Sequence, residues 1–549
     1  MGCRTLSYNE IKGTSQLFKD FLFDFKKVAP YYCADFKDLD RFRGKASKLA
    51  ESFYARTELA DILLDQNRQY GLGQKSLENV EKLKDEKSCV VFTGQQVGML
   101  TGPLYTIYKT LTSIKLANLL ESEIGIPVIP IFWLAADDHD FEEVRHVYII
   151  DKGGKPVRIY YEPESDLGDV PMGFVKCDKK INTFLDEVLE ALPKTEYSDD
   201  VERKVRESYR EGTLLVDAFG KMLGKFFENS GLVIVNPSDI RVKQLAAPIY
   251  AREIEEYESS NQIISIANTE LDSLGYHLQV HHREDYLNLF YYSGKRVRIG
   301  HNHEGYFIDG VDRKYTREEL IDAVHQSPVY FSPNVLLRPV TQDYLFPTLA
   351  YIAGPAEDAY FAQIKDLHGH FDVECPIVFP RISATILDRH ATKTLDKYEL
   401  KLPDLMDDRS LQAAIKEIVE EQVPDEVMEK FDEGREEITS RILEFEKYLE
   451  NLDEGVRKTV HKTKGRVDYE LKSLQEKIVK AYKKKNDNVV RAVQKCADFV
   501  FPEASLQERH LNVLTFINKY GPDFIDRISE HLKLDAYDHQ VLCLEDIGY

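Results

Sequence analysis

The sequence is 549 residues long, with 43% hydrophobic and 30% charged residues and a formal net charge of −22 at pH 7. At roughly 150 residues per domain, this length predicts three to four domains and excludes a small disulfide-stapled scaffold. The acidic charge disfavours non-specific binding to nucleic acid or to an anionic membrane, because phosphate groups are repelled.

The seven cysteines are odd in number and include no C-x-x-C pair, so neither a disulfide framework nor a zinc ribbon is indicated. No apolar run reaches the roughly 18–20 residues that a membrane span needs, and the N-terminus has no apolar leader segment. We therefore expect a cytoplasmic protein with no membrane partner and no nucleic-acid partner.

The first half of the chain predicts a helical segment followed by a Rossmann-type core. Residues 1–85 are polar, with helix-period apolar positions that would pack on the core. Residues 86–150 hold a β-rich run, a glycine loop (TGQQVGMLTGP, residues 93–103), a helical pattern over 104–121 and a strand-like run over 127–134. Strand, loop, helix and strand in this order predict a βαβ unit, with ligands at the carboxyl ends of parallel strands.

The core is expected to resume after an insertion. Residues 151–230 mix turn clusters and acidic helices, which is typical of an inserted subdomain. Residues 231–390 form the predicted second half of the core, beginning with a buried strand at 232–236. A second, β-rich insertion lies near 275–330, where alternating runs and turns predict antiparallel hairpins.

The C-terminal part predicts a coiled coil and a returning tail. In residues 391–495, apolar positions between Ile438 and Val456 alternate in steps of four and three, the spacing of a coiled-coil seam. An antiparallel hairpin within the chain, turning near Gly455 and Gly465 and with additional pairing possible, is the preferred arrangement; a long helix pairing with a second molecule is the alternative. Residues 496–549 predict a helical tail that packs back on the core.

The glycine loop is the first candidate site. Glycines 94, 98 and 102 are spaced by four between a strand and a helix, where the backbone can approach a ligand and the helix N-terminus favours an anion. The loop is neither a P-loop nor a dinucleotide fingerprint. Gln95 and Gln96 supply uncharged amides that suit a nucleotide or an amino acid. The alternative is a tight turn whose glycines serve packing.

The second candidate is the acidic segment DDHDFEE at residues 137–143, directly after a buried run. Asp138 next to His139 would favour a protonated imidazole and orient it, which suits general acid–base catalysis. So many carboxylates predict a Mg²⁺ ion or a substrate ammonium group. The alternative is a solvated loop with an aspartate that caps the helix at 141–147.

The third candidate lies in residues 338–364. Arg338 can clamp a carboxylate or a phosphate, and Gln342 and Asp343 are polar residues inside an apolar helical stretch. Gly354 precedes a helix start that carries Glu357, and Arg381 follows a further strand. The alternative is a structural loop whose polar groups satisfy one another. Isolated histidines and buried cysteines are interpreted as structural, so no metal ligand is assigned.

Four stretches, TGQQVGMLTGPLYTIYKTLTSIKLA, FWLAADDHDFEEV, RPVTQDYLFPTLAYIAGPAEDAYF and PIVFPRIS, followed by a coiled coil and a helical tail, resemble the BshC family over essentially the whole chain. Members of that family are assigned cysteine ligation in bacillithiol biosynthesis. The resemblance implies an α/β fold with a Rossmann-type nucleotide-binding core like that of class I aminoacyl-tRNA synthetases. It also implies inserted connecting-peptide subdomains and an α-helical coiled coil that supports a homodimer.

The implied reaction joins L-cysteine to glucosaminyl-malate, with ATP and Mg²⁺ activating the carboxylate; whether AMP or ADP is released stays open. The synthetase analogy concerns the fold alone, because the glycine loop carries no histidine. Another amino-acid-activating or nucleotidyltransferase-like enzyme and a non-catalytic coiled-coil scaffold are the alternatives. The resemblance assigns catalysis to Gln96, Asp138 and His139. It assigns substrate or nucleotide binding to Gln95, Gly98, Gly102, Pro103, Tyr105, Arg338, Gln342, Asp343, Gly354, Glu357 and Arg381.

Overall fold

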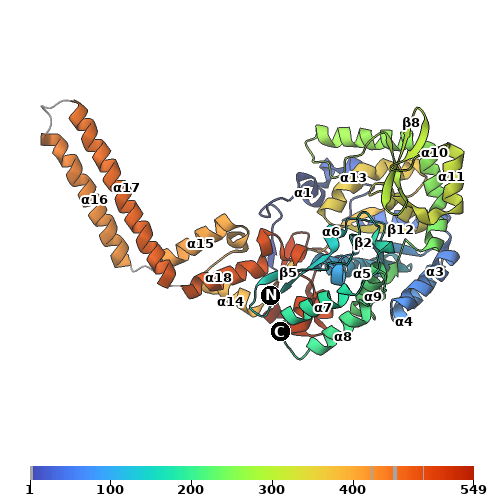
Figure 1. Cartoon of the computed structure of the whole chain (residues 1–549), viewed down its shortest axis with the longest axis horizontal. Coiled ribbons are helices and arrows are strands. Elements are labelled where there is room, and N and C mark those ends of the chain that lie inside the picture. The colour runs from blue at the N-terminus through green and yellow to red at the C-terminus, as the bar shows by residue number, and fades with distance from the viewer. Residues whose placement is uncertain (1–3, 422–424, 449–453, 486, 549) are drawn as a thin grey trace. The chain divides into compact units, whose positions relative to one another are not determined.

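The chain forms two compact units (Figure 1), and the computed structural model describes residues 4–421, 425–448, 454–485 and 487–548 of it. The first unit is Met1–Ile386 together with Gln507–Tyr549, and the second is Leu387–Leu506. The second unit therefore begins and ends slightly outside the 391–495 range that the heptad pattern predicts. Along the described stretches, none of the helices is long and apolar enough to cross a lipid bilayer.

A five-stranded sheet forms the centre of the first unit, with the strand order β13-β12-β2-β3-β6 and parallel pairing throughout. Its interior strands read as continuous apolar runs because they are buried on both faces. The predicted βαβ unit is present. The strand bounds are β2 (Cys89–Gln96), β3 (Val128–Ala135), β6 (Val233–Val235), β12 (Thr348–Ala353) and β13 (Ile377–Pro380).

Helices cover this sheet. The crossover helix α5 (Leu104–Ile124) joins β2 to β3 and packs on both strands. Among the N-terminal helices that the sequence predicts, α2 (Leu39–Glu51) contacts β12 and α3 (Arg56–Gln69) contacts β6. Helix α13 (Pro355–His370) joins β12 to β13, as expected for a parallel pair.

The first insertion is an antiparallel pair of strands followed by helices, and it begins at His146, before the predicted boundary at residue 151. Strands β4 and β5 form a hairpin. The bounds are β4 (His146–Ile150), β5 (Pro156–Tyr160), α7 (Lys180–Ala191), α8 (Ser198–Ser208) and α9 (Leu215–Phe226).

The second insertion contains the predicted hairpins, in a sheet of order β10-β9-β8-β7-β11 that follows the long helix α10 (Ile240–Ser273). All of its strand pairs are antiparallel. The bounds are β7 (Tyr286–Tyr292), β8 (Arg296–Asn302), β9 (Gly305–Ile308), β10 (Lys314–Tyr315), α11 (Arg317–Gln326) and β11 (Phe331–Pro333).

The histidine-rich stretch before β7 differs from its predicted strand form. Residues 277–285 have no regular secondary structure, although their sequence alternates. His301 lies within β8, whereas His303 is in the turn that follows. Among the described residues, no group of three or more histidine, cysteine or carboxylate side chains is arranged to hold a metal ion.

A small sheet of order β1-β15-β14 joins the two ends of the chain. Strand β1 (Arg4–Leu6) pairs antiparallel with β15 (His539–Cys543), and β15 lies next to β14 (Ala384–Leu387). The sequence predicts neither β1 nor β15, because both lie in stretches interpreted as helical. The tail does belong to the first unit from Gln507 onward.

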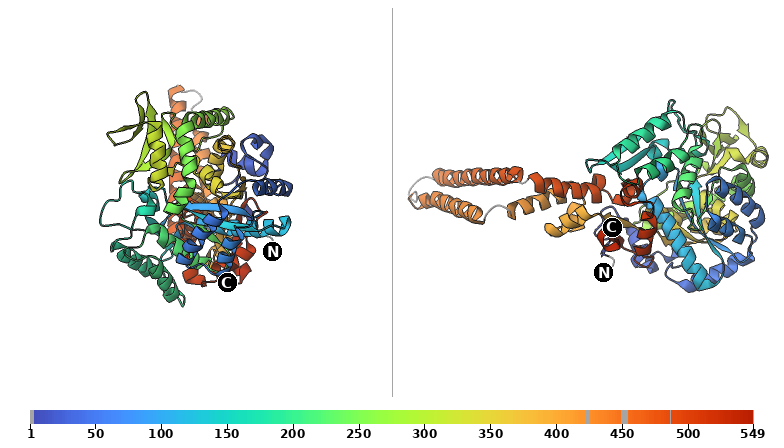
Figure 2. Two further views of the ribbon diagram at one scale, coloured as in Figure 1. Left: turned by 90° about the vertical axis from the view of Figure 1, so that its right-hand side faces the viewer. Right: turned by 90° about the horizontal axis from the view of Figure 1, so that it is seen from below.

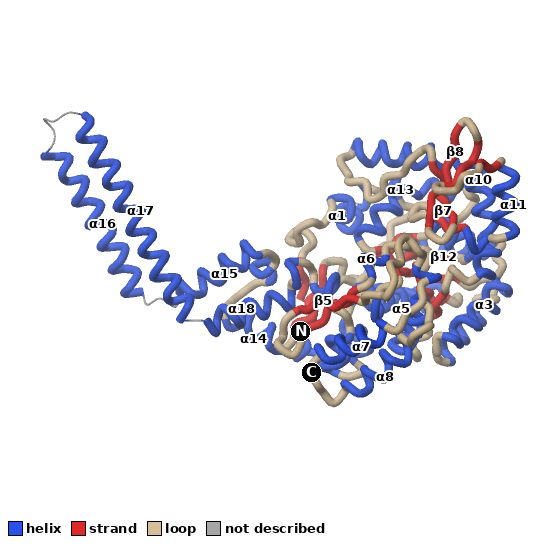
Figure 3. Tube along the Cα trace, viewed as in Figure 1, coloured by secondary structure: helices blue, strands red, loops and turns tan. Residues whose placement is uncertain are grey.

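The second unit is built from helices, which Figure 3 colours blue. Its long helices α16 (Asp425–Tyr448) and α17 (Glu454–Lys485) lie side by side, as Figure 1 and the right-hand view of Figure 2 show. An ion pair of 2.7 Å between Arg435 Nε and Asp468 Oδ1 links them. The hairpin within the chain, preferred from the sequence, is therefore present. The heptad positions Leu449 and Leu452 lie outside the described residues.

Candidate functional site

A cavity of about 720 Å³ opens at the carboxyl ends of the parallel strands, entirely within the first unit. This is the place where open α/β sheets bind ligands. The ends of β2 and β3 and the start of α13 form its floor, and the second insertion supplies the opposite wall. The lining residues used below are Gly94, Gln95, Gln96, Tyr105, Lys109, Asp137, Asp138, Glu143, Asn288, Arg296, Asn334, Arg338, Tyr351, Gly354, Glu357, Tyr360, Arg381 and Arg509.

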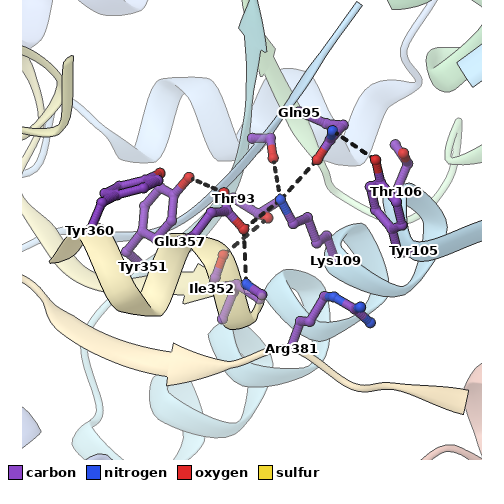
Figure 4. Close-up of polar contacts among 12 residues, drawn as sticks. Thr93, Gln95, Tyr105, Thr106, Lys109, Tyr351, Ile352, Glu357, Tyr360 and Arg381 are labelled. Carbon is purple, nitrogen blue, oxygen red and sulfur yellow. Dashed lines mark hydrogen bonds and ion pairs between the residues drawn. The ribbon is translucent and has the colours of Figure 1, made fainter. Parts of the chain in front are cut away.

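Lys109 is buried and lies at the centre of a group of polar contacts in the cavity lining, here called the deep wall (Figure 4). It projects from α5, and its ammonium donates to the carbonyl oxygen of Gly94 and to Oε1 of Gln95, both at 2.9 Å. Its Nζ also lies 2.5 Å from Oε2 of Glu357. Burial lowers the pKa of Lys109, while the Glu357 carboxylate opposes that shift.

Glu357 connects this lysine to the start of α13. Its Oε2 accepts a 2.8 Å hydrogen bond from the backbone N–H of Gly354, which is the N-cap of that helix, and its Oε1 accepts one of 2.8 Å from the Tyr351 hydroxyl. A glutamate at the third helical position is therefore held by the helix start itself. Lys109, Gly354 and Tyr351 thus fix this carboxylate in one orientation.

Arg338 forms the adjoining wall from helix α12 (Leu337–Leu345). Its guanidinium donates to the Tyr360 hydroxyl and to Oε1 of Gln342, both at 3.0 Å. These partners are neutral, and Arg338 makes no ion pair among the residues that the structure describes. A half-buried cation whose hydrogen-bond partners are neutral provides a place for an anionic ligand group.

Gln342 and Asp343 lie behind this wall and do not line the cavity, against the prediction that they bind substrate. The Gln342 amide donates to Asp343 Oδ1 at 2.9 Å, and Asp343 Oδ2 lies 3.0 Å from Nε2 of His368. All three side chains are buried. Their arrangement matches the alternative in which polar groups satisfy one another, with Gln342 orienting Arg338.

Gln96 occupies the rim of the cavity. Its amide nitrogen donates to Oδ2 of Asp138 at 2.6 Å and to Oε2 of Glu143 at 3.0 Å, so one side chain joins two carboxylates. Gln95, its neighbour along β2, points instead to Lys109 and, at 3.1 Å, to the Tyr105 hydroxyl. The two glutamines therefore serve opposite sides of the cavity.

His139 lies beside the rim rather than in the lining, with about one third of its side chain exposed. Its Nδ1 is 3.8 Å from Asp138 Oδ1 and 3.4 Å from Nη1 of Arg296. Arg296 extends from β8 across the cavity and donates to the carbonyl of Pro333 at 2.8 Å. Burial lowers the pKa of Arg296, and among the described residues this guanidinium also lacks an ion-pair partner.

The remaining acidic residues have partners within the chain, so the cluster does not require a cation to be ordered. Asp137 pairs with the buried Lys243 at 2.7 Å. Asp140 caps α6 (Phe141–Val144) by accepting from the backbone N–H of Glu143, and Glu142 pairs with Arg145 at 2.8 Å. The capping alternative therefore holds for Asp140.

Gly98, Gly102 and Pro103 do not line the cavity, against the prediction of an anion site at this loop. A Cβ on Gly98 would lie 3.4 Å from the Cα of Gly102, whose φ of +70° suits glycine. Pro103 is the N-cap of α5, and the N–H of Leu104 donates to the carbonyl of Leu511 at 2.9 Å. The tail of the chain thus occupies this helix start, and the glycines serve packing.

Arg381 reaches the cavity from the end of β13 and is held from behind. Its Nη2 donates to Oε1 of the fully buried Glu508 at 2.6 Å. That carboxylate also accepts from the Ser383 hydroxyl at 2.8 Å, and Ser383 contacts His539 at 2.6 Å. Burial lowers the pKa of His539 to about 4, so the imidazole is neutral near pH 7.

Sequence reasoning missed several lining residues. Lys109 and Lys115 are the only charged side chains of the crossover helix before Glu121, which is a signal that could have identified Lys109. Arg296, Asn288 and Arg509 carry no comparable signal, because they come from a hairpin and from the tail that only the tertiary fold brings to the sheet.

The fold defines a Rossmann-like protein with a helical hairpin in a second unit. Its cavity opens at the carboxyl ends of the parallel strands, where proteins of this class bind ligands. Two family models match the chain: "Bacillithiol biosynthesis BshC, N-terminal Rossmann-like domain" over residues 1–382 and "Bacillithiol biosynthesis BshC, C-terminal coiled-coil domain" over residues 384–544. The chain belongs to this BshC family. The fold class predicted from the sequence, a Rossmann-type core with a coiled coil, is thereby confirmed.

Curated relatives match the chain over nearly its whole length. A protein of Salinibacter ruber is 35% identical over 528 residues, covering 96% of each chain. One of Bacillus licheniformis is 30% identical over 536 residues, covering 97% of this chain and 99% of its own. Each carries the name "Putative cysteine ligase BshC".

Proposed function

We propose that this protein is a ligase that forms an amide bond between L-cysteine and glucosaminyl-malate, with ATP as the source of carboxylate activation. The names of its relatives support ligase activity and cysteine as a substrate. The observation that carries the proposal is the pair Arg296 and Arg338, two cavity-lining guanidiniums whose partners among the described residues are neutral. Such groups suit the carboxylate and phosphate groups of these substrates.

The charged and polar side chains that line the cavity suit the charged groups of a nucleotide and an amino acid bound together. Arg381 and Lys109 already have carboxylate partners, so we assign the phosphate or carboxylate oxygens to Arg296 and Arg338 ahead of these two residues. ATP supplies a leaving group for the carboxylate, because an amide does not form spontaneously from a free acid and an amine in water.

The acidic rim suits the amine of cysteine. Asp138 and Glu143 converge on the amide of Gln96, and an ammonium group near them would be attracted in the same way. The amine must lose a proton before it attacks a carbonyl carbon. His139 lies next to Asp138 and Arg296 and is the side chain we assign to accept that proton.

The test is to incubate the purified chain with ATP, Mg²⁺, L-cysteine and glucosaminyl-malate, and to follow the thiol by mass spectrometry and the nucleotide by chromatography. We expect bacillithiol together with stoichiometric release of AMP or ADP, and the nucleotide released identifies how the carboxylate is activated. Arg296→Gln should abolish product formation. Arg313→Gln, which alters an exposed ion pair with Glu319, is the matched control and should leave product formation unchanged. A folded wild-type protein that makes no product and consumes no nucleotide would support the scaffold alternative.

A cytoplasmic homodimer is part of the same proposal. The helical hairpin exposes large apolar side chains, Phe445, Tyr448 and Tyr469, as a helix pair does when it has a further partner. Reduced cysteine and ATP are both available in the cytoplasm. Deleting residues 426–493 should convert a dimer to a monomer in a solution mass measurement, and an unchanged dimer would contradict this assignment.

A further inference from the structure

Two cysteines meet on the surface of the first unit, away from the cavity lining. Cys33 follows the short helix Ala29–Tyr31, and Cys375 lies two residues before β13. Both sulfurs approach the carbonyl oxygen of Pro376, at 3.2 Å for Cys33 and 3.8 Å for Cys375. The two thiols therefore share one carbonyl oxygen, which brings them within reach of each other.

This pair is more accessible than the other described cysteines. Cys33 is exposed and Cys375 is partly exposed, while Cys89, Cys177, Cys496 and Cys543 are all buried. Burial protects a thiol from solutes and raises the pKa of Cys89 and of Cys496 to about 12. Only the surface pair therefore combines contact between two thiols with access from solution, among the residues that the structure describes.

The surroundings make the two thiols unequal. The hydrogen bond from Cys375 lowers the pKa of Cys33, and the ammonium of Lys45 lowers it further. Lys45 is almost fully buried and pairs with Glu374, the residue before Cys375, at 3.5 Å. The pKa of Cys375 is raised well above its usual value, first through its contact with Cys33. Cys33 is thus the thiol that ionises first.

We propose that Cys33 and Cys375 form a thiol–disulfide exchange site that reacts with low-molecular-weight disulfides and closes to a reversible intramolecular disulfide. The Cys33 thiolate attacks one sulfur of the disulfide RSSR, forming a mixed disulfide and releasing one RS⁻. Cys375, after losing its proton to solvent, attacks the Cys33 sulfur and releases the second RS⁻. The protein loses two electrons and two protons, and RSSR becomes two RSH.

This arrangement follows the division of roles in known redox pairs, in which one thiolate is exposed and stabilised while the second thiol resolves the mixed disulfide. Cysteine pairs that oxidise in reducing compartments are commonly transient or redox-sensing rather than structural. The site is independent of the proposed ligase reaction, since neither cysteine lines the cavity.

The test uses the reduced full-length chain and glutathione disulfide as the probe. After incubation, remaining thiols are blocked in acid, and peptides are analysed by mass spectrometry without reduction. We expect a cross-linked peptide pair that contains Cys33 and Cys375 and disappears after treatment with dithiothreitol. In Cys375→Ser, a glutathione adduct should accumulate on Cys33 instead, because no resolving thiol remains. In Cys33→Ser, both the cross-link and the adduct should be lost.

A matched pair of lysine variants tests the role assigned to charge. Lys45→Met should slow the reaction of Cys33 at pH 7 by at least about threefold, because its thiolate loses a nearby cation. Lys48→Met changes an exposed lysine of the same helix and should leave the rate unchanged. The proposal is overturned if the wild-type protein, folded by circular dichroism, forms no Cys33–Cys375 cross-link, or if adducts fall equally on the buried cysteines.

Discussion

The deep wall and the rim of the cavity are built differently. In the deep wall, Lys109 and Glu357 form an ion pair, and four further hydrogen bonds hold the two side chains to Gly94, Gln95, Tyr351 and Gly354. At the rim, Gln96 bridges two carboxylates that water also reaches. Charges in the deep wall are strongly coupled to the stability of the fold, whereas rim charges are partly solvated and can be changed at small structural cost.

The largest expected effect is that of Lys109→Met. It leaves Glu357 largely buried without its cation, so the free energy of unfolding should fall by about 3–5 kcal/mol. Turnover should also fall by about 100-fold or more, because Gln95 and the start of α13 lose their common anchor. Urea denaturation and product formation measure the two effects.

The double variant Lys109→Met/Glu357→Gln is the control for that prediction. It removes both charges, so it should lose less stability than the sum of the single variants. Strictly additive losses would show that the two residues are not coupled, and the distinction between deep wall and rim would fail.

The second effect concerns Glu253, which supports the opposite wall. Its Oε1 accepts from the N–H of Asn288 at 2.8 Å and from the side chain of Asn288 at 3.0 Å. Burial raises the pKa of Glu253 from 4.5 to about 7. The folded protein therefore holds a proton that the unfolded chain releases, and stability should fall by about 3 kcal/mol as the pH rises from 4.5 past 7.

Glu253→Gln keeps the acceptor for Asn288 and removes the titration. Its advantage in free energy of unfolding over the wild type should therefore grow across this pH range, as measured by urea denaturation at pH 5, 6, 7 and 8. If the two proteins show parallel pH profiles, Glu253 does not titrate in this window.

The third effect separates activity from stability at the rim. His139→Ala and Gln96→Ala should each reduce turnover severely, by about 100-fold. Their stability should change by no more than about 1 kcal/mol, since the carboxylates near Gln96 are partly hydrated. Thermal unfolding and the ligase assay, run on the same preparations, measure both quantities. Unchanged turnover in both variants would remove these residues from the reaction.

The smallest effect is that of Asp140→Ala. This side chain caps a helix of only four residues at the surface, so its loss should cost about 0.5 kcal/mol and leave turnover intact. Asp138→Asn, two residues away, should reduce turnover. Equal effects of the two substitutions on turnover would mean that the acidic segment acts as a diffuse charge rather than through Asp138.

The sequence predicted the parts of this protein that have local signatures. The apolar run ending in TGQQ, the helix after Pro103 and the next strand follow from periodicity and punctuation, and the helical hairpin follows from heptad spacing. Gln95, Gln96 and Asp138 were found because polar groups follow buried strands.

What the sequence did not predict depends on distant parts of the chain. Arg4 pairs with Val541, and no local pattern records such a partner. Gly98 and Gly102 look like ligand-binding glycines, yet the fold fills the space beside them with Leu511 and Asn512. A glycine needed for close packing and one needed for close approach of a ligand have the same local sequence, so tertiary structure alone separates them.

The arrangement of the small sheet has a consequence for synthesis on the ribosome. Glu508 and His539 hold Arg381 in place, and β15 pairs with the first strand of the chain. Glu508, His539 and β15 all leave the ribosome after the entire second unit, Leu387–Leu506, has been made. A nascent chain can therefore complete its parallel sheet early, but the cavity acquires its Arg381 wall only when the last strand emerges. Incomplete chains would carry a folded core without a finished site.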